Sequence, residues 1–337
     1  MPLFKLLLQR VISLSGEDRQ WSAGPQVEPL EERRMYASHV KYVPKFSHVV
    51  VVMEENQAED EVIGNSQLSY FNVLANGGAD FTNSFAETHP SQPNYLALFS
   101  GSTQGVTTDD PSGPFSDSNL AEALIAKGQT YATYADALPF DGYTGSDSGE
   151  YVTKHDPASD FTNIPSSTHL TFNDFPQTAA GFANLPTVSF VIPDLLHDMH
   201  DGSPLEANNW LKLNLGAYAR WATANNSLLI ISWDEDDNTS VNRIPTIFYG
   251  ANVKTDVYTE TIDHYNVLRT IEDMYGLSHF GYSGEYGDIR DCWTNPPPAT
   301  KATVVNAAAQ PRAAEVTELA AAAPQKQIDD LKSLLDD

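Results

Sequence analysis

The sequence is poor in cysteine, in long apolar runs and in basic residues. Cys292 is the only cysteine among 337 residues, so no intrachain disulfide can form and the redox compartment stays open. No apolar run approaches the roughly 18 residues that a membrane-spanning helix needs, so we expect no transmembrane segment. Basic residues number 19 against 45 acidic ones, which gives a formal net charge of −26 at pH 7. This charge argues against nucleic acid or an anionic membrane as a partner, and an anionic substrate would need a local positive charge such as a metal ion.

The two ends of the chain differ in composition from its middle. A short leucine run near the N-terminus is interrupted by Gln9 and Arg10, which makes it a poor secretory signal. The segment VEPLEERRMYAS is similar to a signature near the N-termini of some exported bacterial proteins. We therefore expect export to the periplasm or the cell exterior, and we interpret residues 1–45 as a targeting extension. Residues 294–337 are rich in Pro and Ala and are predicted to form a linker followed by a helical tail.

Residues 46–293 form the predicted main domain, in which short apolar runs alternate with segments of helical periodicity. The first run, SHVVVVM, is short and β-branched, as expected for a strand buried on both faces. Further strands are predicted at 80–85, 130–135, 187–192, 227–233 and 244–250, and helices at 68–75, after Ser91, at 119–128 and at 205–224. This alternation predicts an α/β protein with a doubly wound, mostly parallel central sheet flanked by helices. In such sheets, sites form beyond the carboxyl ends of the strands.

The segment HPSQPNY places Ser91 between two prolines. Proline fixes its own φ angle and biases the preceding residue toward extended backbone, so the turn around Ser91 is restrained on both sides. The ordinary interpretation is a rigid loop whose serine caps the following helix. A rigidly held hydroxyl is also what a nucleophile requires, so the other polar clusters decide between the two interpretations.

Polar side chains follow three of the predicted strands at one edge of the sheet. They are Glu55 and Asn56 after the first strand, His197 and His200 after the strand at 187–192, and Asp234 and Glu235 after the strand at 227–233. Each acidic cluster alone is typical of a solvated turn, but carboxylate and amide oxygens at one edge also suit a hard cation. Without further cysteines or an HExxH motif, zinc ligation by the histidines is less favoured than acid/base or phosphate contact.

Six sequence blocks, in this order and spacing, resemble the phosphoesterase family of acid phosphatases and phosphatidylcholine-type phospholipases C, within the alkaline-phosphatase-like superfamily. The blocks are VVVMEEN, HPSQPNY, IPDLLHDMHD, ISWDEDD, RIPTIFYGA and DHYNVLRTIEDMYGL. The resemblance covers roughly residues 46 to 282 and implies a doubly wound α/β fold. Ala58 and Glu59 depart from the Ser and Phe that the family often has, and Asn242 and Arg243 stand where the phospholipase branch carries a histidine.

The resemblance implies a nucleophile and a metal site. Ser91 becomes the nucleophile. The implied ligands of the metal ion are Glu55, Asn56, Ser91, Asp234 and Glu235. All of these ligands offer oxygen atoms, which suits a hard divalent ion such as Mg²⁺, Ca²⁺ or Mn²⁺.

The resemblance also implies the groups that contact the substrate. His197 and His200 are implied to surround the phosphoryl group, and one of them is expected to protonate the leaving oxygen. His89, Asn94 and Asp198 are the remaining predicted substrate contacts. These residues together predict a site that binds a small phosphate ester.

The leading hypothesis is a metal-dependent phosphomonoesterase, similar to acid phosphatases, that acts through a phosphoserine intermediate. A phospholipase C-type phosphodiesterase is the alternative, but the predicted loops at 103–118 and 139–186 are polar and offer no apolar rim for a lipid. A sulfatase is less favoured because Tyr95 stands where its nucleophile motif has arginine. A catalytically silent exported binding protein is disfavoured because Ser91 and all the ligand candidates are present. The oligomeric state is not predicted.

Overall fold

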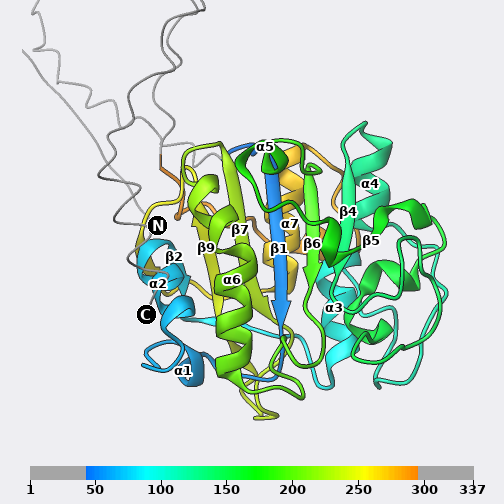
Figure 1. The fold of residues 1–337 in the computed structure, drawn as a ribbon, viewed down its shortest axis with the longest axis horizontal. Coiled ribbons are helices and arrows are strands. Elements are labelled where there is room, and N and C mark those ends of the chain that lie inside the picture. Colours follow the sequence, from blue (N-terminus) through cyan, green and yellow to red (C-terminus); the bar gives the residue numbers. More distant parts are fainter. Residues whose placement is uncertain (1–42, 295–337) are drawn as a thin grey trace, which may run out of the picture. The chain divides into compact units, whose positions relative to one another are not determined.

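The VVVV segment forms the centre of the main sheet, as predicted. Strand β1 (His48–Glu54) pairs in parallel with β7 (Ser227–Trp233) on one side and with β6 (Val188–Ile192) on the other. Val49 to Val52 are fully buried because helices cover both faces of the sheet. The computed structural model describes residues 43–294, and Figure 1 shows this part in colour.

The main sheet has eight strands in the order β10-β2-β9-β7-β1-β6-β4-β5. Its other members are β2 (Ala79–Phe81), β4 (Tyr131–Ala135), β5 (His169–Thr171), β9 (Thr246–Gly250) and β10 (Asp256–Tyr258). Strand β9 runs antiparallel to both of its neighbours, and every other neighbouring pair is parallel. The prediction of a mostly parallel central sheet is therefore confirmed.

Two predicted strands are each divided between the main sheet and a second, three-stranded sheet. This second sheet has the order β11-β3-β8, with β3 (Ser84–Phe85), β8 (Arg243–Ile244) and β11 (Ile262–Asp263). The predicted strand at 80–85 breaks at a turn, and the one at 244–250 is interrupted at Pro245. Proline lacks the N–H that would continue the ladder, so the chain changes sheets there.

Helices form a layer on each face of the main sheet (Figure 1). One layer contains α3 (Ser91–Ser100), α4 (Leu120–Ala126) and α7 (His264–Tyr275), and the other contains α2 (Ser69–Gly77), α5 (Ala179–Phe182) and α6 (Pro204–Ala222). Successive side chains of a strand point to opposite faces, so Val49 and Val51 pack with the first layer and Val50 and Val52 with the second. A short helix, α1 (Glu59–Val62), follows β1.

Helix α3, which begins at Ser91, is held closely at its far end. Gly101 ends it with φ +68°, a left-handed conformation that favours glycine. A Cβ atom on Gly101 would collide with the carbonyl oxygen of Phe280, and one on Gly281 would collide with the carbonyl oxygen of Gly101. The N–H of Tyr282 donates to the Gly101 carbonyl at 2.7 Å. The end of α3 therefore contacts the segment after α7 backbone to backbone.

The predicted loop at 139–186 is largely irregular, but it contains β5, α5 and short 3₁₀ helices, including η1 (Thr153–His155). Within the described part of the chain, no helix has the length and apolarity needed to cross a bilayer. Most of the predicted targeting extension (1–45) and tail (294–337) lies outside the described residues. Both assignments, and the expectation of export, stay predictions.

Candidate active site

The acidic residues predicted after β1 and β7 meet at one edge of the sheet. The N–H of Asp234 donates to the carbonyl of Glu54 at 2.9 Å, so the two strand ends are in register. The N–H of Asn56 then donates to Oδ1 of Asp234 at 3.1 Å. Asn56 has φ +55°, a left-handed conformation that asparagine tolerates, and there the chain turns away from the sheet. The structure thus brings together the two acidic clusters as the sequence predicted.

Ser91 lies against these acids as the first residue of α3. Its Oγ is 3.1 Å from Oε2 of Glu55 and 3.2 Å from Oε1 of Glu235. Only 2% of the residue is exposed to solvent. A helix N-terminus has unpaired N–H groups and a partial positive charge, which favours a bound anion such as a phosphoryl group.

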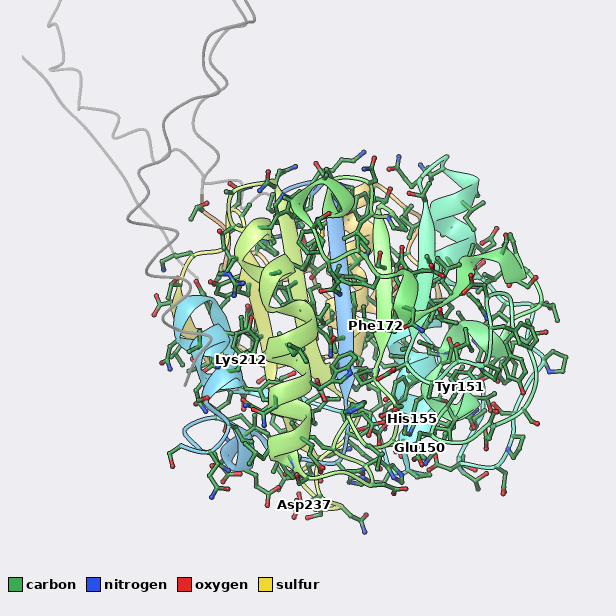
Figure 2. All side chains as sticks on the ribbon, in the orientation of Figure 1. Glu150, Tyr151, His155, Phe172, Lys212 and Asp237 are labelled. Atoms are coloured by element: carbon green, nitrogen blue, oxygen red, sulfur yellow. The ribbon has the colours of Figure 1, made fainter. Side chains whose placement is uncertain are left out.

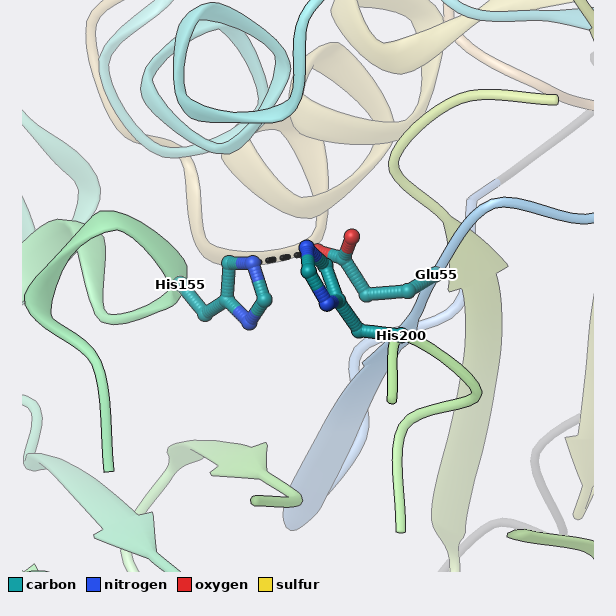
Figure 3. Close-up of side chains that lie close together, drawn as sticks. All are labelled: Glu55, His155 and His200. Atoms are coloured by element: carbon teal, nitrogen blue, oxygen red, sulfur yellow. Dashed lines mark ion pairs between the residues drawn. The ribbon is translucent and has the colours of Figure 1, made fainter. Parts of the chain in front are cut away.

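His155, which the sequence analysis did not single out, completes the buried part of the site. Its Nε2 is 3.0 Å from Oε1 of Glu55 and its Nδ1 is 3.0 Å from Oδ2 of Asp198. The ring stacks on Tyr95 at a centroid distance of 5.2 Å, and the Tyr95 hydroxyl donates to Glu55 Oε1 at 2.6 Å. Figure 3 shows His155 beside Glu55 and His200, and each of the three offers one ligand atom within 4.8 Å of the others.

Charge accumulates at this site in a region shielded from water. Burial raises the pKa of Glu55, but the charge and hydrogen bond of His155 outweigh burial and hold this pKa at about 2. Burial lowers the pKa of His155, but Glu55 and Asp198 raise it to about 10. Glu55 and His155 therefore form a buried ion pair. Burial together with Glu55 and Glu235 raises the pKa of Asp234 well above its usual value.

The donor set fits a divalent cation. Three carboxylates converge near Ser91, and Oδ2 of Asp234 is buried without a hydrogen-bond partner among the described residues. The amide of Asn56 donates to Glu55 Oε2 at 2.9 Å and so lies beside the same oxygens. A hard cation would satisfy the unpaired oxygen and offset the repulsion between the carboxylates.

His89 lies at the rim of the site and contacts Glu235. Its Nδ1 is 2.6 Å from Oε2 of Glu235, and its Nε2 is 3.0 Å from the carbonyl of Thr239. Burial raises the pKa of Glu235, and the hydrogen bond and charge of His89 partly offset this increase. The imidazole therefore orients a carboxylate that contacts Ser91.

Two predicted substrate contacts, Asn94 and Asp198, make structural hydrogen bonds in this arrangement, and their contact with a substrate stays a prediction. Asn94 is fully buried, and its amide accepts from the N–H groups of Glu87 and Thr88 and donates to the carbonyls of Thr88 and Pro90. Asp198 is also fully buried. It orients His155 with one oxygen and accepts the N–H of His200 with the other. Both side chains hold the site in shape because their polar atoms are already used.

The two predicted histidines are separated in the structure. His200 lies beside Glu55 and His155. His197 belongs to another cluster, with its Nδ1 2.9 Å from Asp136 and 2.8 Å from Asp194. The prediction assumed that an i, i+3 spacing places both rings on one side of a turn. The segment is not helical, and Met199 has φ +84°, so the backbone directs the two side chains differently.

Comparison with known proteins identifies the family. The sequence model described as the Phosphoesterase family matches residues 65–278. The chain belongs to this family. A bacterial relative of this phosphoesterase, the phosphatidylinositol-3-phosphatase of Mycobacterium tuberculosis, is 47% identical over 74% of this chain and 84% of its own length.

More distant proteins agree with the assignment. A probable acid phosphatase of Kluyveromyces lactis is 29% identical, and the match covers 70% of this chain but only 60% of the yeast protein. The lipoteichoic acid synthase LtaP of Listeria monocytogenes shares the fold, with a TM-score of 0.50, 12% identity and coverage of 72% of this chain and 76% of that one. The expected α/β fold with a mostly parallel central sheet flanked by helices is confirmed. The phosphoesterase is a hydrolase that acts on phosphoric ester bonds.

Proposed function

We propose that this phosphoesterase is a metal-dependent phosphomonoesterase that acts through a phosphoserine at Ser91. The observation that carries the proposal is the placement of Ser91 Oγ, at a helix N-terminus, within 3.1 and 3.2 Å of two carboxylates of a buried acidic site. A hydroxyl held in this way needs little further ordering before it attacks phosphorus.

Each residue of the site has a separate role in the proposed reaction. Ser91 forms the new O–P bond while the bond to the leaving oxygen breaks, Glu235 accepts the serine proton, and the leaving oxygen takes up a proton from water. Water then hydrolyses the phosphoserine. Glu55, Asn56, Ser91, Asp234 and Glu235 are the proposed ligands of a divalent cation. When bound, such a cation favours the serine alkoxide and offsets phosphoryl charge.

The histidine roles follow from their positions. His155 is locked between Glu55 and Asp198, so it fixes the orientation and charge of Glu55. His200 is partly exposed and lies beside this pair, so we propose His200 rather than His197 as the imidazole that faces the phosphoryl group.

Trapping the intermediate tests this proposal. The protein is mixed with an aryl phosphomonoester, quenched in acid and digested for mass spectrometry. We expect a phosphate adduct on the peptide that contains Ser91 and no adduct in Ser91→Ala. A folded Ser91→Ala protein that keeps more than about a tenth of wild-type kcat, a loss of only ~1.4 kcal/mol, would exclude Ser91 as the nucleophile.

A phosphomonoester on a lipid head group is a second candidate substrate. The M. tuberculosis relative bears the name of a phosphatidylinositol-3-phosphatase. Large apolar side chains are also exposed in loops that follow strands at the site's edge: Phe140 after β4, Leu196 after β6 and Val241 after β7. Such side chains would help the protein approach a lipid surface, which the sequence analysis did not anticipate. Hydrolysis of a phosphoinositide in neutral vesicles, compared with its soluble head group, tests this candidate.

We further propose that the protein is exported, on the strength of the N-terminal signature alone. Detection of the full-length protein in the culture medium or periplasm of its host, without release of a cytoplasmic marker, is the expected result. Retention with the cytoplasmic marker would contradict it.

A further inference from the structure

Lys154 carries a positive charge at the edge of the site. It belongs to η1 and directly precedes His155, which Figure 2 places near the end of the sheet where β1 finishes. Its Nζ lies 3.0 Å from Oδ2 of Asp109 and 3.2 Å from Nε2 of His200. No other Lys or Arg in residues 43–294 has a hydrogen bond or ion pair to a proposed site residue.

Asp109 connects this ammonium group to the nucleophile. While its Oδ2 pairs with Lys154, its Oδ1 accepts the N–H of Gln92 at 3.0 Å. Gln92 immediately follows Ser91 in the first turn of α3. The carboxylate thus fixes Lys154 relative to the end of the helix that carries the nucleophile.

The hydrogen bonds of Lys154 leave one donor for a ligand. A lysine ammonium has three N–H donors and no acceptor, so Nζ of Lys154 donates to Nε2 of His200. Asp109 and His200 use two donors. The third has no hydrogen-bond partner within residues 43–294 and is available to an oxygen of a ligand beside His200.

Lys154 stays charged there. Burial lowers the pKa of Lys154, but Asp109, Glu55 and Asp234 raise it above its usual value. The side chain is 18% exposed, which leaves its end accessible to a small ligand and partly shielded from water. A charge-assisted hydrogen bond is stronger in such surroundings than on an open surface.

We propose that Lys154 binds a phosphoryl oxygen and makes the site prefer dianionic phosphomonoesters over monoanionic diesters. The inference rests on the proposed function and deepens it. A monoester dianion carries one negative charge more than a diester. Glu55, Asp234 and Glu235 repel this additional charge. The Lys154 ammonium group offsets the repulsion and so favours the dianion over the monoanionic diester.

The test compares Lys154→Met with Lys154→Arg. Lys212→Met serves as the matched control, since it removes the same charge from an exposed position on α6 (Figure 2). The substrates are p-nitrophenyl phosphate and its methyl ester, which share a leaving group and differ by one charge. Binding of inorganic phosphate by calorimetry gives a readout that does not depend on turnover, and circular dichroism verifies folding.

We expect Lys154→Met to lose about 10- to 100-fold in kcat/KM on the monoester and less than about 3-fold on the diester, and to bind phosphate more weakly by a similar factor. Lys154→Arg should recover most of both losses, and Lys212→Met should behave as wild type. Equal losses on the two esters, or unchanged phosphate binding, would overturn the inference. If Lys154→Met does not fold, Lys154→Arg and Lys154→Gln are compared in the same way, and an unchanged monoester-to-diester ratio in Lys154→Gln overturns it equally. Failure of the proposed function is distinguishable, because wild type itself would then show no phosphoserine.

Discussion

His155 and Glu55 form an ion pair with 3.0 Å between Nε2 and Oε1, and their side chains are 1% and 0% exposed. An ion pair so far from water is sensitive to the loss of one partner, because the remaining charge is left buried and uncompensated. The pair also sets the position of a carboxylate that contacts Ser91.

Replacement of His155 tests the importance of this pair. We expect His155→Gln to lower the free energy of unfolding by about 3 kcal/mol and to reduce kcat by at least about tenfold, because Glu55 loses its counter-charge and its orientation. Urea denaturation and steady-state kinetics measure the two effects. His279→Gln, which alters an exposed histidine paired with Asp273, should change neither by more than a small amount. Wild-type behaviour of His155→Gln would remove His155 from the site.

Metal content tests the acidic cluster. Protein prepared without chelator should contain a stoichiometric divalent metal, and Asp234→Asn should lose it, because Asp234 is buried between Glu55 and Glu235. Elemental analysis measures the metal, and Asp237→Asn, in the exposed turn that follows (Figure 2), is the control. Chelator should abolish turnover and one of Mg²⁺, Ca²⁺ or Mn²⁺ should restore it. Full activity in metal-free protein would contradict the assignment.

Substrate preference separates the phosphatase from the phospholipase alternative. We expect higher kcat/KM on aryl phosphomonoesters than on matching diesters or on phosphatidylcholine vesicles, since the charged groups around Ser91 suit a dianion. The assays share one pH and one metal concentration. Equal or greater efficiency on phosphatidylcholine would favour the phospholipase C-type activity instead.

Stability should depend on pH through Glu272, a buried residue of α7. Burial raises the pKa of Glu272 to about 7, while hydrogen bonds from Ser283 and the N–H of Phe280 partly offset this. The folded protein holds the Glu272 proton up to about pH 7, whereas the unfolded chain releases it near pH 4.5. Glu272 therefore does not destabilise the fold below about pH 4.5, and the free energy of unfolding falls as the pH rises from 4.5 to 7.

The measurement compares wild type with Glu272→Gln in urea at pH 5 and pH 8. The stability of wild type relative to the variant should fall by about 2 kcal/mol between the two pH values. Glu285→Gln, the same change at an exposed position, should show no such trend. A pH-independent difference between wild type and Glu272→Gln would show that the carboxyl titrates normally in the folded protein.

The sequence predicted the structure best where a local hydrophobic pattern also fixes the position of a residue in the sheet. A β-branched run such as Val49 to Val52 indicates a buried strand, and the carboxyl ends of parallel strands must meet, so the pattern alone is enough to bring Glu55 and Asp234 together. The antiparallel direction of β9 was not predictable, because an apolar pattern reads the same in both directions. His155 lies in a short 3₁₀ helix within a largely irregular segment, and the position of this helix depends on packing with α3. The separation of His197 from His200 depends on the backbone conformation at Met199, which the spacing of the two histidines does not reveal.

The glycine contact at the far end of α3 has a consequence for how the site can change. The helix is ten residues long, so Gly101 lies about 15 Å from Ser91, and it touches the segment at Gly281 through main-chain atoms with no side chain between them. A methyl group added at Gly101 would collide with main-chain atoms, so either α3 or the segment at Gly281 would have to shift. A shift of α3 would change the spacing between the Ser91 hydroxyl and the carboxylates of Glu55 and Glu235. Crystallography of Gly101→Ala would show whether Ser91 moves with its helix.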